Sequence, residues 1–361
     1  MRRPEREATL DSMVDLSLVL VAFRSSGVAG EAVASFRDEA GRLGVSHEVV
    51  IVDHSEDAEE CERLRSLAPE KILALPNRGY AAGVNAGIAA STGAMVLVGN
   101  PDIRLAAGAL GALLEALGSG WGIVGPQFEL AGILLPPADV QTPREEVRRW
   151  LASRSRAFWN RYFRDEVRRW RQAWEAPGPI AVPNLSGALV GFRREVAKRT
   201  GAWDEGYFLY FEETDWLRRA ASAGVRIALV PAARVEHRWG HAADPHALGS
   251  HLLRSRSRFL RAHFGLRGRI LAGMKSSRTP LRPQPIVEGY ASLPAGELLW
   301  LLSPTSLGFP AGGFVGTASA CIRTVRGFFD ALPRPSRHLL LAVEPVSGKV
   351  FGPWSWERAD G

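Results

Sequence analysis

The chain has 361 residues, of which 46% are hydrophobic and 23% are charged, values typical of a globular protein with one large domain and a smaller one. Two cysteines far apart in sequence exclude a disulfide framework and a cysteine-based metal cluster, and they suit a reducing, cytoplasmic compartment. No run approaches the roughly 20 apolar residues that span a bilayer. The net charge of +7 favours an anionic partner such as a nucleotide, a phospholipid surface or nucleic acid.

Short apolar strands alternate with helical segments over the first 125 residues, after a leader at 1–14 that we expect to be disordered. The strands are predicted at 16–21, 48–52, 71–75 and 94–98, and the helices at 28–43, 57–67, 81–90 and 106–117. This alternation is typical of βαβ units, so we predict an α/β fold with a mainly parallel central sheet flanked by helices. Ligands of such sheets bind at the carboxyl ends of the strands.

The segment 141–175 differs in character because it is rich in arginine and contains Trp150, Trp159, Trp170 and Trp174 at helical spacing. One interpretation is a helical insertion that packs its tryptophans inward and solvates its arginines. The other is a lid or membrane-surface helix that meets an anionic, lipid-linked acceptor. The second interpretation would place the protein peripherally on the inner face of the membrane.

Ordered elements continue to residue 282, the expected end of a main domain that begins at residue 15. We predict a strand at 184–190, helices at 193–199 and 212–220, a helix stop at Gly224, and an extended pair at 227–230 and 233–237 interrupted by Pro231. A basic helix is expected at 250–275, before a proline-rich linker. Residues 283–361 are expected to form a small β-rich appendage with strands at 298–302, 339–343 and 349–354, the last two joined by a hairpin turn at 346–348.

Three carboxylates, Glu212, Glu213 and Asp215, fall within four residues of a segment that is otherwise aromatic or apolar. Ionised carboxylates are costly to hold in such surroundings, so they tend to be catalytic or linked to a metal. The simpler interpretation is a helix N-terminus, where acidic residues suit the helix dipole. The two interpretations are compatible, because a helix start can also hold a catalytic base.

Polar residues follow several of the predicted strands. Asp53 could accept the imide N–H of a uracil or thymine ring, or it could simply cap the next helix. The segment 77–87 is a glycine-spaced turn running into a helix, which suits a phosphate but also suits tight packing on the sheet. Its spacing is neither that of a P-loop nor that of a dinucleotide-binding motif.

Asp102 follows the fourth strand in the sequence Asn100-Pro101-Asp102. One carboxylate and a nucleotide diphosphate can together hold Mg²⁺ or Mn²⁺, although Asn-Pro-Asp is also a common turn. His237 could add a nitrogen ligand, which would favour Mn²⁺, or it could be structural.

In order and spacing, these motifs resemble glycosyltransferase family 2, and within it the bacterial rhamnosyltransferase-like group with a GT-A fold. The resemblance spans roughly residues 16–265. It is carried by Val52-Asp53-His54-Ser55, Asn77-Arg78-Gly79-Tyr80-Ala81-Ala82-Gly83-Val84-Asn85, Gly99-Asn100-Pro101-Asp102, Ser186-Gly187-Ala188, Gly201-Ala202-Trp203-Asp204-Glu205, Asp215, and Val235-Glu236-His237.

The resemblance implies roles for individual residues. Glu213 would be the catalytic general base, where the family more usually has Asp, with Glu212 and Asp215 in support. The donor nucleotide would contact Asp53, Ser55, Asn77, Gly79, Gly83, Asn85 and Asn100. Asp102 and His237 would hold Mn²⁺ or Mg²⁺, and Ser186, Gly187 and Trp216 would line the acceptor or sugar pocket.

The expected function is therefore inverting, metal-dependent transfer of a sugar, with rhamnose or another deoxysugar as the first candidate. The donor would be of the dTDP or UDP type, and the acceptor a glycan, a lipid-linked molecule or a natural product, with contact to an anionic membrane. Two alternatives remain open at this point. One is an inactive family member that acts as a binding subunit, and the other is a nucleic-acid-binding protein, although we expect no nucleic acid because that function leaves the carboxylates at the strand ends unexplained.

Overall fold

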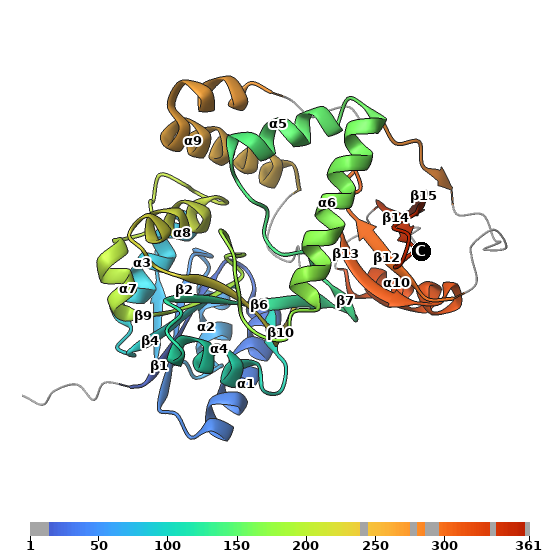
Figure 1. Cartoon of the computed structure of the whole chain (residues 1–361). Coiled ribbons are helices and arrows are strands. Elements are labelled where there is room, and N and C mark those ends of the chain that lie inside the picture. Colours follow the sequence, from blue (N-terminus) through green and yellow to red (C-terminus); the bar gives the residue numbers. More distant parts are fainter. Residues whose placement is uncertain (1–13, 239–244, 275–279, 286–295, 333–336, 358–361) are drawn as a thin grey trace, which may run out of the picture.

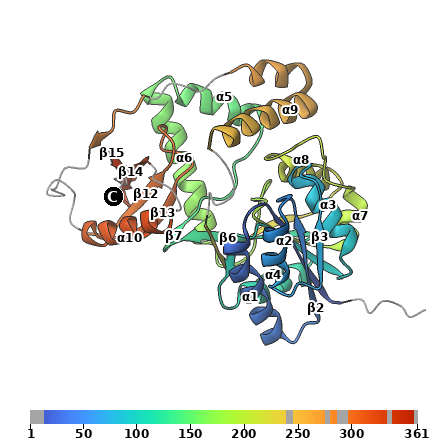
Figure 2. The ribbon, with the colours of Figure 1, turned by 180° about the vertical axis from the view of Figure 1, so that it is seen from behind.

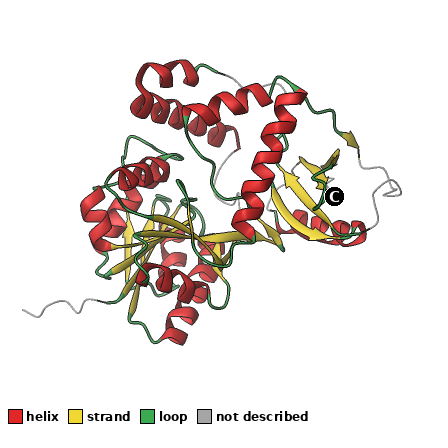
Figure 3. Ribbon diagram, viewed as in Figure 1, coloured by secondary structure: helices red, strands yellow, loops and turns green. Residues whose placement is uncertain are grey.

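The computed structural model describes residues 14–238, 245–274, 280–285, 296–332 and 337–357. Figure 1 shows an N-terminal α/β lobe beside a second lobe that combines the helices α5 and α6 with C-terminal strands, and Figure 3 shows the same view by secondary structure. Apart from Val14, the leader expected at 1–14 lies outside the described residues.

The first half of the N-terminal lobe is a parallel sheet of four strands in the order β4-β1-β2-β3. The strands are β1 (Leu16–Ala22), β2 (His47–Asp53), β3 (Lys71–Ala74) and β4 (Met95–Gly99), connected by α1 (Ser26–Leu43), α2 (Ala58–Arg65) and α3 (Tyr80–Ala90). Every residue of β1 is buried. The predicted α/β fold class is confirmed.

Both faces of this sheet are covered by helices, as Figure 2 shows from behind. Leu16, Leu18 and Leu20 belong to a core with α1 and α4 (Ala109–Gly118). The alternate residues Val19 and Val21 belong to a second core with α3, α7 (Arg194–Thr200) and α8 (Glu212–Ser222). The period-2 alternation of β1 thus feeds two apolar cores, which explains its unbroken hydrophobic sequence.

Beyond β4 the sheet becomes mixed. The strands are β5 (Ile103–Leu105), β6 (Ile123–Leu130), β8 (Ile180–Ala181), β9 (Leu189–Arg193) and β10 (Ile227–His237), with β9 antiparallel to both β4 and β6 and β10 parallel to β6. The strand predicted at 184–190 starts only at Leu189. The predicted break at Pro231 is wrong, because β10 continues through it with a register shift between Val230 and Arg234.

The second lobe contains α5 (Pro143–Ala152) and α6 (Arg156–Trp174), packed on antiparallel strands. These strands are β12 (Leu298–Ser303), β13 (Gly312–Gly316), β14 (Arg337–Val343) and β15 (Val350–Glu357), with β11 (Gln284–Pro285) at the edge. β7 (Ile133–Leu134) pairs with both β6 and β13, so the strands of both lobes join into one sheet. The helix α10 (Ala318–Ala331) was not predicted; it packs on this sheet through Cys321, Val325, Phe328 and Phe329.

Three of the four tryptophans of the 141–175 segment are core residues, and the fourth, Trp150, is half-buried. Trp159 and Trp170 are completely buried and Trp174 is nearly so, in one cluster with residues of β12 and β14. The inward-packing interpretation of these side chains is therefore correct, and they cannot enter a membrane in this conformation. The C-terminal strands in turn depend on α5 and α6 for one side of their core.

The basic segment forms α9 (Pro245–Ala272), which is two helical stretches joined at Gly265 with φ 54° and ψ −128°. The second stretch lies on the first, because Gly268 is so close to the backbone of Leu260 that a Cβ would not fit. Leu271 packs with Phe259 and Leu260 in the same cluster. Figure 1 shows α9 beside α5, and the two helices are in contact.

We predict that Trp159→Ala destabilises the protein by about 3 to 5 kcal/mol, because it removes a fully buried ring and leaves a cavity. The ring also stacks on Phe163 at 4.6 Å, and its Nε1 donates to Leu307 O at 2.7 Å. The matched control is Trp150→Ala, which removes a half-buried ring under Arg154 and should cost about 1 kcal/mol. Denaturant unfolding followed by circular dichroism measures both, and equal midpoints would contradict the packing described above.

Candidate functional site

The candidate site lies where the loops after β2 and β4 meet the loop before β9, the end of β10 and the start of α8. Parallel strands bring their carboxyl ends to one edge of the sheet, so residues far apart in sequence converge there. Asp102 lies between β4 and β5, and β5 pairs with β10 so that Ile103 is opposite His237.

Asp102 and His237 face each other, with Asp102 Oδ1 3.3 Å from His237 Nε2. Their side chains are only 12% and 5% exposed. Asn100 Nδ2 lies 3.5 Å from the same imidazole nitrogen, and the ring of Phe128 packs against His237. Among the described residues, no cluster of three or more His, Cys, Asp or Glu could hold a metal ion. A cation at this pair would therefore need oxygens from a ligand and from water.

Glu213 lies in the first turn of α8, and the turn into this helix is strained. The two residues before it, Tyr210 and Phe211, both have left-handed backbone angles, with φ 68° and 69°. Such angles are unfavourable for aromatic residues and persist only where surrounding contacts hold them. Burial and the adjacent Glu213 raise the pKa of Glu212 well above its usual value. Burial also raises the pKa of Glu213, although hydrogen bonds from its own backbone and from Thr214 oppose that rise.

Glu213 is connected to the Asp102 region through two short loops. A Cβ on Gly187 would lie 3.3 Å from the Glu213 side chain, so these two residues are in close contact. The next residue, Ala188, accepts a backbone hydrogen bond from Asn100 at 3.0 Å. Tyr80 donates its hydroxyl to Gly187 O at 3.1 Å. Burial raises the pKa of Tyr80 well above its usual value, and the charges of Glu212, Glu213 and Asp102 add to the effect.

The residues predicted to contact the nucleotide form the loops around this edge. Asp53 is 2% exposed and accepts from the backbone N–H of Ser55 at 2.9 Å, while the Ser55 hydroxyl accepts from Arg24 N. Asn77 Oδ1 accepts from the N–H of Gly79 at 3.1 Å. Their contact with a donor stays a prediction.

Two glycines predicted to contact the nucleotide are required sterically. Gly79 has φ 101°, and a Cβ there would lie 2.6 Å from Phe208 O. A Cβ on Gly83 would lie 2.6 Å from Val21 and 2.7 Å from His54. Both glycines therefore allow α3 to pack closely on its neighbours. This was the alternative left open for the segment 77–87, and their contact with a donor also stays a prediction.

Two predicted site residues have other roles in the structure. Trp216 is completely buried, donates to Gly201 O and stacks on Trp203 at 5.4 Å, so its assignment to an acceptor pocket is wrong. The side-chain oxygen of Asn85 accepts a hydrogen bond from the N–H of Trp203, and its nitrogen donates to the Trp203 carbonyl and to the Glu205 carboxylate. It holds the 201–211 loop, and the structure does not support its assignment to the nucleotide site. Ser186 bonds the N–H of Ala188 and shapes the loop beside Glu213.

Asp215 joins α8 to α9. It accepts from Arg219 Nε at 2.8 Å and pairs with His263 Nε2 at 2.7 Å. Burial alone would raise the pKa of Asp215, but the hydrogen bonds and charges of His263 and Arg219 lower it overall. Asp215 therefore stays ionised at neutral pH and supports the start of α8.

The sequence interpretation missed Tyr80, Asn184, Thr214 and His263. Tyr80 stands inside the glycine-spaced motif and Thr214 between Glu213 and Asp215, where the glycine spacing and the acidic residues drew attention instead. Asn184 was assigned to a strand. His263 lies in the basic helix, and its contact with Asp215 spans 48 residues of sequence, so no local pattern could reveal it.

Comparison with known proteins identifies the family. The model of the family described as glycosyltransferase like family 2 matches residues 15–256. This is well over half of the chain, and the chain belongs to that family. The family assignment made from the motifs is confirmed.

Two curated relatives are N-acetylglucosaminyl-diphospho-decaprenol L-rhamnosyltransferases from two strains of Mycobacterium tuberculosis. Each is 33% identical to this chain over 162 residues, which is 44% of this chain and 50% of the relative. The matched region therefore spans half the length of these relatives.

Two solved structures share part of the fold. One is the mannosyltransferase PcManGT from Pyrobaculum calidifontis in complex with GDP-Man and Mn²⁺, with a TM-score of 0.46, 18% identity, and coverage of 71% of this chain and 68% of that one. The other is GalNAc-T7 with UDP, GalNAc and Mn²⁺, with a TM-score of 0.48, 13% identity, and coverage of 71% and 49%.

Proposed function

We propose that this chain is an inverting, metal-dependent glycosyltransferase that moves a sugar from a nucleoside diphosphate donor to an acceptor hydroxyl. The observation that carries the proposal is the position of Glu213. It lies at a helix start whose entry is strained, against Gly187, and the Gly187–Ala188 loop connects it to the Asp102–His237 pair. A proton acceptor and a site for a charged leaving group thus lie on neighbouring loops.

The Asp102–His237 pair fits a divalent cation. Asp102 Oδ1 is buried without a hydrogen-bond donor, and an imidazole nitrogen lies 3.3 Å from it. One carboxylate oxygen and one imidazole nitrogen suit Mn²⁺, and Mg²⁺ is the alternative. When bound, the cation would neutralise charge on the donor diphosphate.

Glu213 would take the proton from the acceptor hydroxyl as that oxygen attacks the anomeric carbon. Its raised pKa suits the role, because a general base works best when its pKa lies near the operating pH. The C–O bond to the diphosphate breaks as the new C–O bond forms on the opposite face of the sugar. A single displacement of this kind inverts the configuration at that carbon, as in inverting glycosidases.

For the donor we propose a dTDP- or UDP-activated sugar, with rhamnose as the first candidate. The support is the 33% identity to L-rhamnosyltransferases over half of their length. For the acceptor we propose a lipid-linked glycan, because the names of the same relatives specify a decaprenol diphosphate carrier.

A lipid-linked acceptor implies contact with a membrane, and we propose the outer surface of α9 for it. Three apolar side chains are well exposed there: Leu253 at 66%, Leu266 at 73% and Ile270 at 64%. Four exposed arginines lie among them without an ion-pair partner in the described residues: Arg254, Arg261, Arg267 and Arg269. Exposed apolar side chains with unpaired positive charge suit an anionic lipid surface. No described helix is long and apolar enough to cross a bilayer.

Binding of dTDP or UDP should raise the melting temperature of the protein further when Mn²⁺ or Mg²⁺ is present, because ligands that bind the native state stabilise it. Asp102→Ala should abolish the cation-dependent part of this shift. Asp38→Ala, which removes an exposed carboxylate on α1, is the control and should leave it intact. Thermal unfolding with dTDP, UDP, GDP and CDP measures the effect. A cation-dependent shift that persists in Asp102→Ala would place the metal elsewhere.

Glu213→Gln should lower the rate of sugar transfer by about 100- to 10,000-fold, the usual contribution of a general base. Nucleotide binding should persist, because the amide keeps the size of the side chain. Glu195→Gln, which changes an exposed carboxylate on α7, should be fully active. Transfer is measured by release of nucleoside diphosphate in the presence of acceptor. Full activity of Glu213→Gln would reject this base, and a wild-type chain that binds donor without transfer would support the binding-subunit alternative.

The protein should bind vesicles containing phosphatidylglycerol more tightly than vesicles of phosphatidylcholine, and added salt should weaken the binding. The double variant Arg267→Ala/Arg269→Ala should bind the phosphatidylglycerol vesicles about 30-fold more weakly, because each arginine near an anionic surface contributes about 1 kcal/mol of binding free energy. The double variant Leu266→Ser/Ile270→Ser should also weaken it. Val346→Ser, at a 97% exposed position of the other lobe, is the control. Co-sedimentation gives the affinities, and equal binding by all variants would exclude α9 as the contact.

A further inference from the structure

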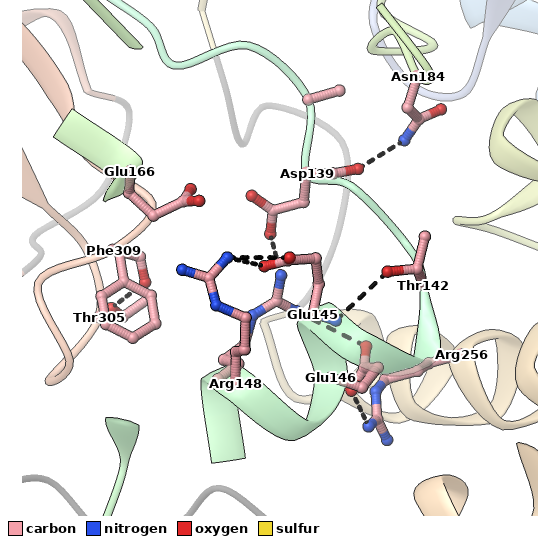
Figure 4. Close-up of polar contacts among 12 residues, drawn as sticks. Asp139, Thr142, Glu145, Glu146, Arg148, Glu166, Asn184, Arg256, Thr305 and Phe309 are labelled. Atoms are coloured by element: carbon pink, nitrogen blue, oxygen red, sulfur yellow. Dashed lines mark hydrogen bonds and ion pairs between the residues drawn. The ribbon is translucent and has the colours of Figure 1, made fainter. Parts of the chain in front are cut away.

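A short chain of hydrogen bonds ends on the Glu213 carboxylate. The Thr214 hydroxyl donates to Glu213 Oε1 at 3.2 Å, and it accepts from Asn184 Nδ2 at 3.3 Å. Asn184 and Thr214 are each only 7% exposed. Asn184 Nδ2 also donates to the backbone carbonyl of Asp139 at 3.2 Å, a contact drawn in Figure 4.

The donors in this chain have a fixed direction. An amide nitrogen can only donate, so the Thr214 hydroxyl accepts a hydrogen bond from Asn184 and directs its own single hydroxyl proton to Glu213. A hydrogen bond of this polarity favours an acceptor that is ionised. The two residues therefore favour the state in which Glu213 can accept a proton.

The same contacts restrict where the carboxylate lies. Glu has one more methylene than Asp, so its carboxylate has more rotamers available. On one side the Glu213 side chain meets Gly187, where a Cβ would come within 3.3 Å of it. From the other direction its Oε1 is held by Thr214. Together, the close loop and the hydrogen bond select one arrangement of the longer side chain.

The end of this hydrogen-bond series that is farthest from Glu213 is anchored in the second lobe. Asp139, whose carbonyl binds Asn184, also pairs through its carboxylate with Arg149 of α5 at 3.1 Å and with Arg169 of α6 at 3.7 Å. Arg169 pairs in turn with Glu166 at 2.6 Å. Figure 4 shows Asn184 approaching the Asp139 backbone above the charged residues of α5. The position of Asn184 thus depends on contacts made by α5 and α6.

We propose that Thr214 and Asn184 are positioning residues that orient Glu213 and keep it ready to accept the proton of the acceptor hydroxyl. This inference rests on the proposed role of Glu213 as the general base. It assigns to the Asn184–Thr214 pair the task of holding the long Glu213 side chain in one arrangement. The hydrogen bond acts on the ionisation of Glu213, so its loss has a specific signature in the pH dependence of the reaction.

The direction of the expected shift in the pH–rate profile follows from the hydrogen bond that Thr214 donates to Glu213. Thr214 lowers the pKa of Glu213 against the rise caused by burial. Without it that pKa rises further, so a smaller fraction of Glu213 is ionised at low pH. The acid limb of the rate profile should move to higher pH. The other titratable groups that face Glu213 are Glu212 and Tyr210 from its own segment and Tyr80 from α3, and none of them is changed in the variants below.

The experiment is the pH dependence of sugar transfer, measured for the full chain and four variants. Thr214→Val keeps the shape of the side chain and removes the hydroxyl. It should move the acid limb to higher pH and lower the rate at the acid end by about 10- to 100-fold, the size expected for one hydrogen bond to a charged group. Asn184→Ala should act in the same direction but less strongly. Thr214→Ser, which restores the hydroxyl, should recover the wild-type limb.

Each outcome separates this inference from the proposed function. If Glu213→Gln, measured alongside as the fourth variant, keeps full activity, the base assignment fails and the inference fails with it. If Glu213→Gln is inactive but Thr214→Val and Asn184→Ala lower the rate equally at all pH values, Glu213 remains the base and the positioning role is rejected. The shift in melting temperature on nucleotide binding shows that each variant is folded. If Thr214→Val is not folded, the acid limb of the pH–rate profile of Asn184→Ala tests the positioning role instead: a shift to higher pH supports it, and an unshifted limb rejects it.

Discussion

The arrangement of the site depends on the strained turn into α8. Tyr210 and Phe211 both hold left-handed backbone angles, which cost free energy for residues with a Cβ. Contacts from two sides hold this turn: Tyr80 N–H donates to Phe208 O at 2.9 Å, and the Ser255 hydroxyl of α9 donates to Leu209 O at 2.7 Å. Because the turn is held in this way, Glu212 is kept buried and Glu213 half-buried at the start of the helix. A relaxed turn would allow α8 to begin elsewhere and would expose the Glu212 carboxylate to water.

The three carboxylates of α8 then differ because their partners differ. Glu212 Oε2 is buried without a hydrogen-bond partner, and burial beside Glu213 favours its protonated form. Glu213 accepts from Thr214, so the ionised member of this adjacent pair is more favourably Glu213. Asp215 is held as an anion by its contacts with Arg219 and His263, which occupy both of its carboxylate oxygens. One sequence cluster thus contains a carboxyl group whose pKa is raised by burial, the proposed proton acceptor and a structural anion, and the difference arises from neighbours rather than from residue type.

The sequence predicted what local patterns encode. The buried strands β1, β2 and β4 have unbroken apolar runs, and the polar residues that follow them, such as Asp53 and Asp102, do lie at one edge of the sheet. Asp102 and His237, both predicted as metal ligands, lie 3.3 Å apart, and their binding of a metal stays a prediction. Local patterns could not show what an apolar helix face packs on. Trp159, Trp170 and Trp174 are covered by strands that come more than 120 residues later in the sequence. The assignment of Trp216 to a pocket also failed because local sequence does not show its packing partner. That partner, Trp203, belongs to a loop whose path depends on Asn85.

The second lobe is connected to Glu213 by two separate routes. One runs from α5 and α6 through Asp139 and Asn184 to Thr214. The other runs through α9, where Arg256 forms an ion pair with Glu146 of α5, while Phe259 packs on Phe211 at 5.3 Å. Both routes end within two residues of Glu213, on opposite sides of it in sequence. A displacement of α5 relative to the N-terminal lobe would therefore change the hydrogen bond on Glu213 and the packing of its strained turn together. The surface of α9 proposed to meet the lipid belongs to the same helix. The proposed lipid contact and the proposed base are thus connected through one helix, because α9 contacts both α5 and the turn that precedes Glu213.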